Sequence, residues 1–481
     1  MENFIFKTKP YDHQLEALVE SCDKKEFALF MEMGCGKSKV TIDNFVHLYG
    51  QGKVNNVLIV APKGVYSTWV NKELETHIPD HVIYDVVKWT SSHTQKFLKD
   101  LDKLFVYDDN LKILVMNIEA FSTKKGCQYA NKFIQANKTM FIIDESTTIK
   151  NPSAKRTANC VRLGKYAHYR RILTGSPITK SPLDLYSQCM FLDPALLGFS
   201  SYFSFRARYA DLKEMTGQGR TFKFVTGYKN LDELNETLSK FSHRVLKKDC
   251  LDLPEKVYIR REIQMTPEQS KAYKELQNFA ATQLKNNKLV TINHIMTQII
   301  RLHQISCGFI GTDDGSITEF TNNRVSELSS ILEETDGKVI IWANYRHDIK
   351  RIEKLLIDTY GEETVGTYFG DVSQERREEV INQFQNPDSP MRFFVGNTQT
   401  GGYGITLTAA NTVIYYSNNY DLEKRLQSED RAHRIGQTNK VTYIDIVCDR
   451  TVDEKIVKAL RKKQSIASTI LGEDNLKDWL T

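Results

Sequence analysis

The chain has 481 residues, of which 41% are hydrophobic and 26% are charged, and its formal net charge is +5. A chain of this length exceeds what one hydrophobic core can hold, so we expect about two to four domains. The composition is typical of a water-soluble globular protein, and the small positive charge permits a polyanionic partner without requiring one. No run approaches the roughly 18 apolar residues that cross a bilayer, so the sequence indicates neither export nor membrane insertion.

The eight cysteines are scattered along the sequence. None belongs to a Cys-x-x-Cys pair or stands with histidines at the spacing of a zinc site, so we expect no structural zinc. His303 and Cys307 could share one face of a helix, but a single pair of this kind is more often packed in a core than bound to a metal. The pattern predicts buried free thiols in a reducing compartment.

A glycine-rich loop follows an apolar run over residues 27–30 and precedes a pattern with helical periodicity over 40–45. Its two glycines allow successive backbone N–H groups to turn toward a polyphosphate, its lysine supplies a positive charge for the β and γ oxygens, and its serine hydroxyl can bind Mg²⁺. A strict phosphate-binding pattern has glycine where Met31 stands, so an ordinary glycine turn with an exposed lysine is the alternative. The candidate nucleotide-binding residues are Met33, Gly34, Cys35, Gly36, Lys37 and Ser38.

Gln14 precedes this loop in the stretch that covers residues 10–14. Its amide carries both a donor and an acceptor, so it could bind the edge of an adenine base. The alternative is the start of a helix on the protein surface.

Three apolar runs over residues 57–61, 113–116 and 140–143 have the length of strands and no polar alternation, which is typical of strands buried on both faces of a parallel sheet. The third run continues directly into Asp144 and Glu145. Adjacent carboxylates at the end of a buried strand are costly unless a cation or hydrogen bonds hold them there. Because a phosphate-binding loop lies in the same domain, Asp144 would hold Mg²⁺ and Glu145 would orient and deprotonate the attacking water. A helix that begins with two acidic residues is the alternative.

A further apolar run over 171–174 ends in a hydroxyl-rich turn where a sensor of the γ-phosphate could lie. From about residue 183 to 330, long charged segments with helical periodicity predict a helical region. Within it, the basic stretch over 241–249 predicts a helix that faces either solvent or a nucleic acid.

After Lys338, strands and helices alternate again. No second phosphate-binding loop accompanies these strands, so this half would complete a site that belongs to the first half. Arg431 and Arg434 are three residues apart and would share one face of a helix, where two guanidinium groups could stabilise a phosphoryl group that gains charge. Two arginines on an exposed helix are the alternative. The predicted strands of this half cover residues 339–342, 365–369, 393–396 and 412–416.

Five stretches of the first half resemble, in their order and spacing, the motifs of the first motor lobe of superfamily-two helicases, and they look most like the Swi/Snf type. Residues 427–437 and 398–410 are similar to the sixth and fifth motifs of that family. One residue departs from the pattern: Thr147 stands where the family's carboxylate motif generally continues with histidine. We expect hydrolysis to survive this replacement but the link from hydrolysis to the third motif to be affected. The five stretches cover residues 10–14, 32–38, 58–63, 143–151 and 173–178.

The resemblance implies an α/β fold of two RecA-like parallel-sheet lobes with a helical insertion between them. The implied domains are an ATP-binding lobe over 1–200, helical protrusions and a linker over 201–330, and a helicase C-terminal lobe over 331–481, which ends in a helical tail over 453–480. ATP and Mg²⁺ are the implied cofactors, with Gln427 near the γ-phosphate. The residues implied to grip DNA phosphates, with lower weight than the ATP site, are Lys63, Asn117, Lys150, Asn344, Arg346, Thr398 and Thr400.

The leading hypothesis from this resemblance is an ATP hydrolase that DNA stimulates and that moves on duplex DNA without separating the strands. Contacts to the phosphate backbone carry no sequence information, so binding should be independent of sequence and should weaken with salt. One alternative is a helicase or fork remodeller that unwinds branched DNA in replication or repair. Another alternative is an ATP-gated switch that acts on a DNA-bound protein partner. The replacement of the usual histidine by Thr147 favours this alternative. The compact chain resembles versions encoded by bacteria and their phages, so we expect it in a bacterial or phage-infected host cytoplasm.

Overall fold

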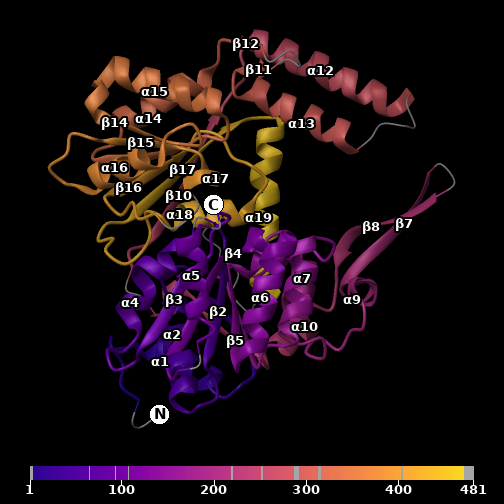
Figure 1. The fold of residues 1–481 in the computed structure, drawn as a ribbon. Helices are drawn as coiled ribbons and strands as arrows, with labels where there is room; N and C mark the ends of the chain where they lie inside the picture. Colours follow the sequence, from indigo (N-terminus) through magenta and orange to yellow (C-terminus); the bar gives the residue numbers. More distant parts are fainter. Residues whose placement is uncertain are drawn as a thin grey trace. The chain divides into compact units, whose positions relative to one another are not determined.

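The structure is a computed structural model that divides into two compact units (Figure 1). The first unit, called the first lobe below, contains most of the residues up to 250, and the second unit, called the second lobe, contains most of those from 253 to 465. No helix among the residues described has the length and apolar character needed to cross a membrane. The residues described are 4–63, 65–92, 94–106, 108–217, 220–250, 253–286, 292–311, 316–401 and 405–470.

The first lobe is built on a seven-stranded sheet with the order β3-β4-β2-β5-β6-β1-β9, in which every neighbouring pair is parallel. The five apolar runs predicted as strands in this half are confirmed, whereas β3 and β9 are not among the predicted strands. The strands are β1 (Glu26–Met31), β2 (Asn56–Ala61), β3 (Tyr84–Lys88), β4 (Leu111–Asn117), β5 (Thr139–Asp144), β6 (Tyr169–Leu173) and β9 (Ser242–Val245).

Helices cover both faces of this sheet, which explains why its central strands are continuous apolar runs. Along β1, Phe27 and Leu29 pack with residues of α1 and α2, whereas Ala28 and Phe30 pack with residues of α6, α7 and α8. Successive side chains of a strand point to opposite faces, so each strand contributes to both cores. The helices are α1 (Asp12–Ser21), α2 (Lys37–Gly50), α6 (Lys124–Ala136), α7 (Lys155–Gly164) and α8 (Leu185–Leu192).

The segment after β6 contains strands as well as the predicted helices. Two strands, β7 (Ala210–Gly217) and β8 (Arg220–Tyr228), pair with each other as a two-stranded sheet. They lie in the chain between α9 (Tyr202–Tyr209) and α10 (Leu231–Ser239).

The predicted basic helix over 241–249 is wrong. Residues 242–245 form the edge strand β9, which pairs in parallel with β1. At the two ends of this pairing, the N–H of Ala28 donates to the carbonyl of Phe241 at 2.9 Å, and the N–H of Glu32 donates to the carbonyl of Val245 at 3.0 Å. A short helix, α11 (Lys247–Cys250), follows. The free edge of β1 supplies hydrogen-bond partners that a pattern of basic residues does not predict.

The second lobe is built on a six-stranded sheet with the order β10-β17-β16-β13-β15-β14, and all its neighbouring pairs are parallel. The four strands predicted in this half are confirmed, and β10 and β17 are additional. The strands are β10 (Lys256–Ile263), β13 (Lys338–Trp342), β14 (Val365–Tyr368), β15 (Phe393–Gly396), β16 (Ala410–Tyr415) and β17 (Val441–Cys448).

Two long helices, α12 (Pro267–Asn286) and α13 (Ile292–Ser306), follow β10 and lie side by side (Figure 1). They account for the predicted helical segments near residues 267 and 297. The predicted helical tail is α19 (Val452–Ile470), and the rest of that prediction, residues 471–480, lies outside the described residues. The other helices of this lobe include α14 (Asn323–Glu333), α15 (Arg346–Tyr360), α16 (Gln374–Gln385), α17 (Thr398–Gly401) and α18 (Leu422–Glu429).

Candidate functional site

The glycine-rich loop joins the carboxyl end of β1 to the amino end of α2. Gly34 and Gly36 both have φ of 87°, a left-handed backbone that glycine adopts without steric cost. A Cβ atom on Gly36 would lie 2.2 Å from Nε2 of Gln14, so the close packing of α1 on the loop also requires glycine there. These two glycines turn the chain into α2, whose first N–H groups form an anion-binding end.

Lys37 is the first residue of α2, and Ser38 follows it. The Lys37 ammonium donates to the main-chain carbonyls of Met31 at 2.9 Å and Glu32 at 3.4 Å, so it lies over the loop rather than in solvent. Both Lys37 and Ser38 are half-buried. A positive charge, a hydroxyl group and a helix amino end therefore meet at one edge of the sheet.

Gln14 of α1 lies against the same loop and is buried. Its Nε2 donates to the carbonyl of Cys35 at 3.3 Å, its Oε1 accepts from the N–H of Tyr11, and the His13 ring nitrogen lies 2.9 Å from the Cys35 carbonyl. Cys35 is fully buried, and burial raises the pKa of its thiol far above the usual range. The structure thus brings Gln14 to the loop, where we predict contact with adenine.

Asp144 ends β5 on the same edge of the sheet as the loop. Its Oδ2 accepts from Nε1 of Trp69 at 2.9 Å, and its Oδ1 accepts from the N–H of Glu145 at 2.9 Å. Burial raises the pKa of Asp144, while the Trp69 hydrogen bond and the Lys37 ammonium oppose that rise. Strand β6 lies between β5 and β1, and its Leu173 pairs with both Asp144 of β5 and Leu29 of β1, so Asp144 and the glycine-rich loop follow the same edge of the sheet.

Glu145 has φ of 48° and ψ of 60°, a left-handed backbone that is unfavourable for a residue with a Cβ atom. Such backbone strain is found most often at functional sites, where surrounding contacts hold it. Thr147, the residue that departs from the family pattern, is buried in the short helix Ser146–Ile149 that follows.

Strand β9 and α11 bring two basic residues to the loop that the sequence reasoning missed. Nη1 of Arg244 donates to the carbonyls of Phe30 at 2.9 Å and Gly175 at 3.0 Å, and the N–H of Lys247 donates to Oε2 of Glu32 at 2.8 Å. The partner strand β1 is more than 200 residues away in the chain, so the basic pattern of this stretch does not reveal the pairing.

Arg431 and Arg434 of the second lobe do not lie on a helix, so that prediction is wrong. Helix α18 ends at Glu429, and both arginines occupy the turns that follow. They still converge, because Nη1 of Arg431 and Nη1 of Arg434 donate to the same carbonyl, that of Ile405, at 3.1 and 3.4 Å. Nη1 of Arg434 also donates to Oγ1 of Thr406 at 3.0 Å.

Gln427 lies on α18 itself and is buried. Its amide bonds to Lys424 and Glu423 of the same helix, each at 3.3 Å. The stretch over 398–410 that resembles the fifth motif is described except for residues 402–404, which lie outside the described residues.

The predicted phosphate-gripping residues of the first lobe follow the carboxyl ends of its strands. Lys63 follows β2 and is exposed, and Asn117 ends β4, where its Nδ2 donates to Oε2 of Glu119 at 2.9 Å. The Lys150 ammonium instead donates to Oγ1 of Thr179 at 2.6 Å.

In the second lobe, Asn344 follows β13 and Thr398 follows β15. The Asn344 carbonyl accepts from Nδ2 of Asn397 at 2.8 Å, and Thr398 is buried. Arg346 is exposed and forms an ion pair with Asp371 at 2.8 Å. Thr400 lies within α17 and is half-buried. All four residues therefore lie at the carboxyl edge of the sheet, where parallel sheets place their ligands.

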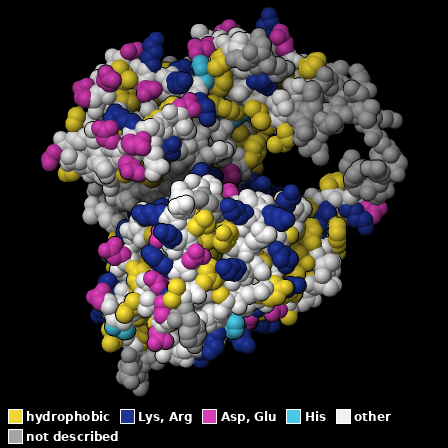
Figure 2. Space-filling view, in the orientation of Figure 1, with side chains coloured by type: hydrophobic (Ala, Val, Ile, Leu, Met, Phe, Trp, Pro, Cys, Tyr) yellow, Lys and Arg dark blue, Asp and Glu magenta, His cyan; other side chains and the backbone are white. Residues whose placement is uncertain are grey.

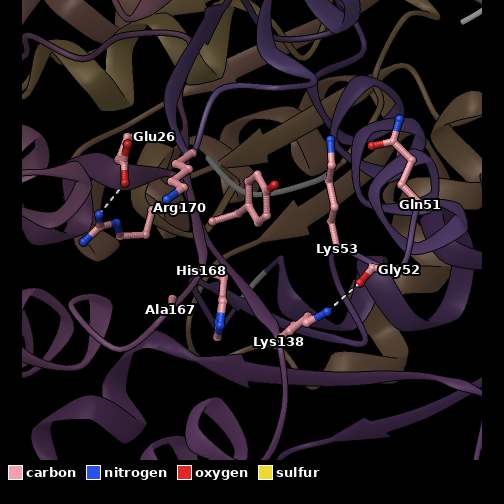
Figure 3. Close-up of a pocket in the computed structure, with 10 residues that line it drawn as sticks. Glu26, Gln51, Gly52, Lys53, Lys138, Ala167, His168 and Arg170 are labelled. Carbon is pink, nitrogen blue, oxygen red and sulfur yellow. Dashed lines mark hydrogen bonds and ion pairs between the residues drawn. The ribbon is translucent and has the colours of Figure 1, made fainter.

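A cavity of about 530 Å³ in the first lobe lies away from this edge (Figure 3). Its lining residues lie at the amino ends of β1 and β6 or precede β2 and β5, whereas the glycine-rich loop follows the carboxyl end of β1. Arg170 pairs there with Glu26, and the Lys138 ammonium donates to the carbonyl of Gly52 at 3.0 Å. This cavity is therefore separate from the candidate site.

Two protein families match successive parts of the chain. The SNF2-related domain matches residues 13–308, and the helicase conserved C-terminal domain matches residues 323–436. The predicted resemblance is thereby confirmed. Together with the two parallel sheets, these matches confirm the predicted α/β fold of two RecA-like lobes.

The chain is also similar to longer curated proteins. An uncharacterized ATP-dependent helicase of Mycoplasma pneumoniae is 26% identical over 92% of this chain and 40% of its own length. The putative ATP-dependent helicase/translocase YwqA of Bacillus subtilis is 26% identical over 94% of this chain and 46% of its own length. The chain thus spans less than half the length of these relatives. The chain is also similar to a solved structure, the Sulfolobus solfataricus SWI2/SNF2 ATPase core in complex with dsDNA, with 24% sequence identity and a TM-score of 0.43. The match covers 100% of this chain and 97% of the chain in that structure.

Proposed function

The chain belongs to the SNF2-related family, and we propose that it hydrolyses ATP and uses the hydrolysis to move along duplex DNA without sequence specificity. The observation that supports this proposal is that β1, which leads into the loop with Lys37 and Ser38, and β5, which ends at Asp144, both pair with β6 in one parallel sheet. The names of the curated relatives, which are ATP-dependent helicases, support an ATP hydrolase.

In this proposal the glycine-rich loop binds the phosphates. The N–H groups at the start of α2 and the Lys37 ammonium neutralise their charge, and Gln14 binds the adenine. The hydroxyl of Ser38 and the carboxylate of Asp144 would hold Mg²⁺, since both are oxygen ligands of the kind that this ion prefers. When bound there, Mg²⁺ would stabilise the charge that develops on the phosphate oxygens. Among the described residues, His, Cys, Asp and Glu side chains form no group of three that could hold a metal by themselves.

Glu145 is the proposed base, because it follows Asp144 directly and has a backbone conformation that fixes its direction. We propose that Arg431 and Arg434 stabilise the charge on the transferring phosphoryl group and that Gln427 acts near the γ-phosphate. An arginine in this role is worth on the order of 10³ to 10⁵ in rate. The shared carbonyl of Ile405 supports a common task for the two arginines, since it holds both guanidinium groups in one place.

Helices α6 and α7 support a polyanionic partner. Together they carry six basic residues and no Asp or Glu, and they pack against each other. Figure 2 shows Lys and Arg side chains over this part of the first lobe. Such a surface suits a phosphate backbone. The six residues are Lys124, Lys125, Lys132, Lys155, Arg156 and Arg162.

The test is steady-state ATP hydrolysis by the purified chain alone and with duplex DNA, single-stranded DNA, forked DNA or RNA, with Lys37→Ala as the blank. We expect strong stimulation by plain duplex and a steep loss of DNA affinity as salt rises. Stimulation by forks alone would instead favour a remodeller of branched DNA. Hydrolysis that no nucleic acid changes would contradict both and leave a switch that acts on a protein partner.

A further inference from the structure

Gln188 connects the loop that carries the two carboxylates to the segment that follows β6. Ser146, directly after Glu145, donates from its hydroxyl to Oε1 of Gln188 at 2.6 Å. Nε2 of Gln188 donates to the carbonyls of Pro177 and Asp184, both at 2.8 Å. Ser146 and Gln188 are fully buried, so these hydrogen bonds do not compete with water.

Further hydrogen bonds hold the Pro177 side of this bridge. Oδ2 of Asp184 accepts from the N–H groups of Thr179 at 3.0 Å and Lys180 at 2.7 Å, which folds the segment tightly against the start of α8. The Gln188 amide therefore bonds through Nε2 to the backbone of this segment and through Oε1 to Ser146.

The same segment is also tied to the glycine-rich loop. Nη1 of Arg244 joins the carbonyl of Gly175, two residues before Pro177, to the carbonyl of Phe30 at the end of β1. Hydrogen bonds thus run from the strand that precedes the phosphate-binding loop, through the turn after β6 and Gln188, to the residue next to Glu145.

We propose that Gln188 is a positioning residue for ATP hydrolysis: it fixes Glu145 relative to the phosphates through Ser146. This inference rests on the proposed function. In this proposal, Ser146 and Gln188, rather than Thr147, link the two carboxylates to the turn after β6. A misplacement of about 1 Å can cost about 100-fold in rate, so a bridge that fixes this geometry acts on kcat rather than on ATP affinity.

The main test is Gln188→Met, which keeps the length of the side chain and removes its hydrogen bonds. We expect kcat to fall by about 10- to 100-fold, while the KM for ATP and the affinity for a non-hydrolysable ATP analogue change by less than about 2-fold. Ser187→Ala is the matched control, because it also removes a buried polar atom of α8. Its hydroxyl has no hydrogen-bond partner within the described residues, so kcat should stay within about 2-fold of the parent chain.

A double variant separates positioning from stability. Gln188→Met alone leaves the Ser146 hydroxyl buried without its acceptor, which destabilises the lobe. Adding Ser146→Ala removes that orphaned group, so the double variant should regain part of the lost stability while kcat stays low. Recovery of kcat together with stability would overturn the inference, as would a kcat of Gln188→Met equal to that of the parent.

Failure of this inference can be distinguished from failure of the proposed function. If the parent chain does not hydrolyse ATP above the Lys37→Ala blank, the proposed function fails and this inference fails with it. If the parent is active and Gln188→Met matches it, only the role of Gln188 is refuted. Circular dichroism and binding of the ATP analogue confirm that each variant is folded. Should Gln188→Met not fold, Ser146→Ala alone must lower kcat several-fold for the inference to stand.

Discussion

Glu145→Gly should make the first lobe more stable than Glu145→Ala does, although both variants should lose hydrolysis. Glu145 has φ of 48° and ψ of 60° and lies between the buried end of β5 and a short helix. Alanine keeps the Cβ atom and its clash in this left-handed conformation, whereas glycine has no Cβ atom. Because both variants remove the rest of the Glu145 side chain, every contact of that side chain cancels in the comparison.

The expected difference follows from two opposing effects. A left-handed conformation costs a non-glycine residue about 1–2 kcal/mol. Glycine in turn costs about 0.5–1 kcal/mol because its unfolded chain is more flexible. The net gain of the glycine variant over the alanine variant therefore lies between about 0 and 1.5 kcal/mol. For a lobe of this size, 1 kcal/mol raises the Tm by about 2–4 °C.

The assay is urea and thermal unfolding of the two variants beside the parent, followed by tryptophan fluorescence. Trp69 is a suitable reporter, since its indole N–H donates to Asp144 next to the substituted position. Hydrolysis by both variants should fall by about 10²- to 10⁴-fold, the usual contribution of a general base. A glycine variant that is clearly less stable than the alanine variant would refute the strain assigned to the backbone at position 145.

Three further results are expected. Lys37→Ala should weaken binding of an ATP analogue by about 10- to 100-fold, since a charge-assisted hydrogen bond is worth about 1.5–3 kcal/mol; unchanged affinity in a calorimetric titration would refute its contact with the phosphates. Arg431→Lys should lower kcat by about 10³-fold with unchanged affinity for the analogue, because lysine lacks the planar fork of arginine, and kinetics within about 3-fold of the parent would refute its role. Asp453 of α19 forms a buried ion pair with Arg324. Burial would raise the pKa of Asp453, but Arg324 and His303 outweigh burial and hold that pKa well below its usual range. The folded pKa thus lies below the unfolded value of about 3.9, so the ion pair stabilises the second lobe fully above that value and the stabilisation is lost as the pH falls through the folded pKa. Asp453→Asn should therefore cost stability at pH 7 and much less at pH 2, as measured by urea unfolding at both pH values.

The sequence by itself determined the centre of each lobe. Parallel strands covered by helices on both faces need apolar side chains on both faces, so β2, β4 and β5 are readable as short apolar runs. It also determined the chemistry at the edge of the first sheet. Glycines with φ of 87° before a lysine, and carboxylates directly after a buried strand, are local requirements that leave local patterns.

Only the tertiary structure decided the edges and the connections. Strand β9 is a strand because β1 offers a free row of hydrogen-bond partners from a distant part of the chain, and its own residues predict a basic helix. The end of α18 at Glu429 takes Arg431 and Arg434 off the helix, yet the carbonyl of Ile405 brings them together. The bridge through Gln188 of α8 joins the turn after β6 to Ser146, which lies 42 residues before Gln188 in the chain. Hydrogen bonds of this kind depend on which backbone groups the fold brings within about 3 Å of a side chain, and a one-dimensional pattern of residue types does not contain that information.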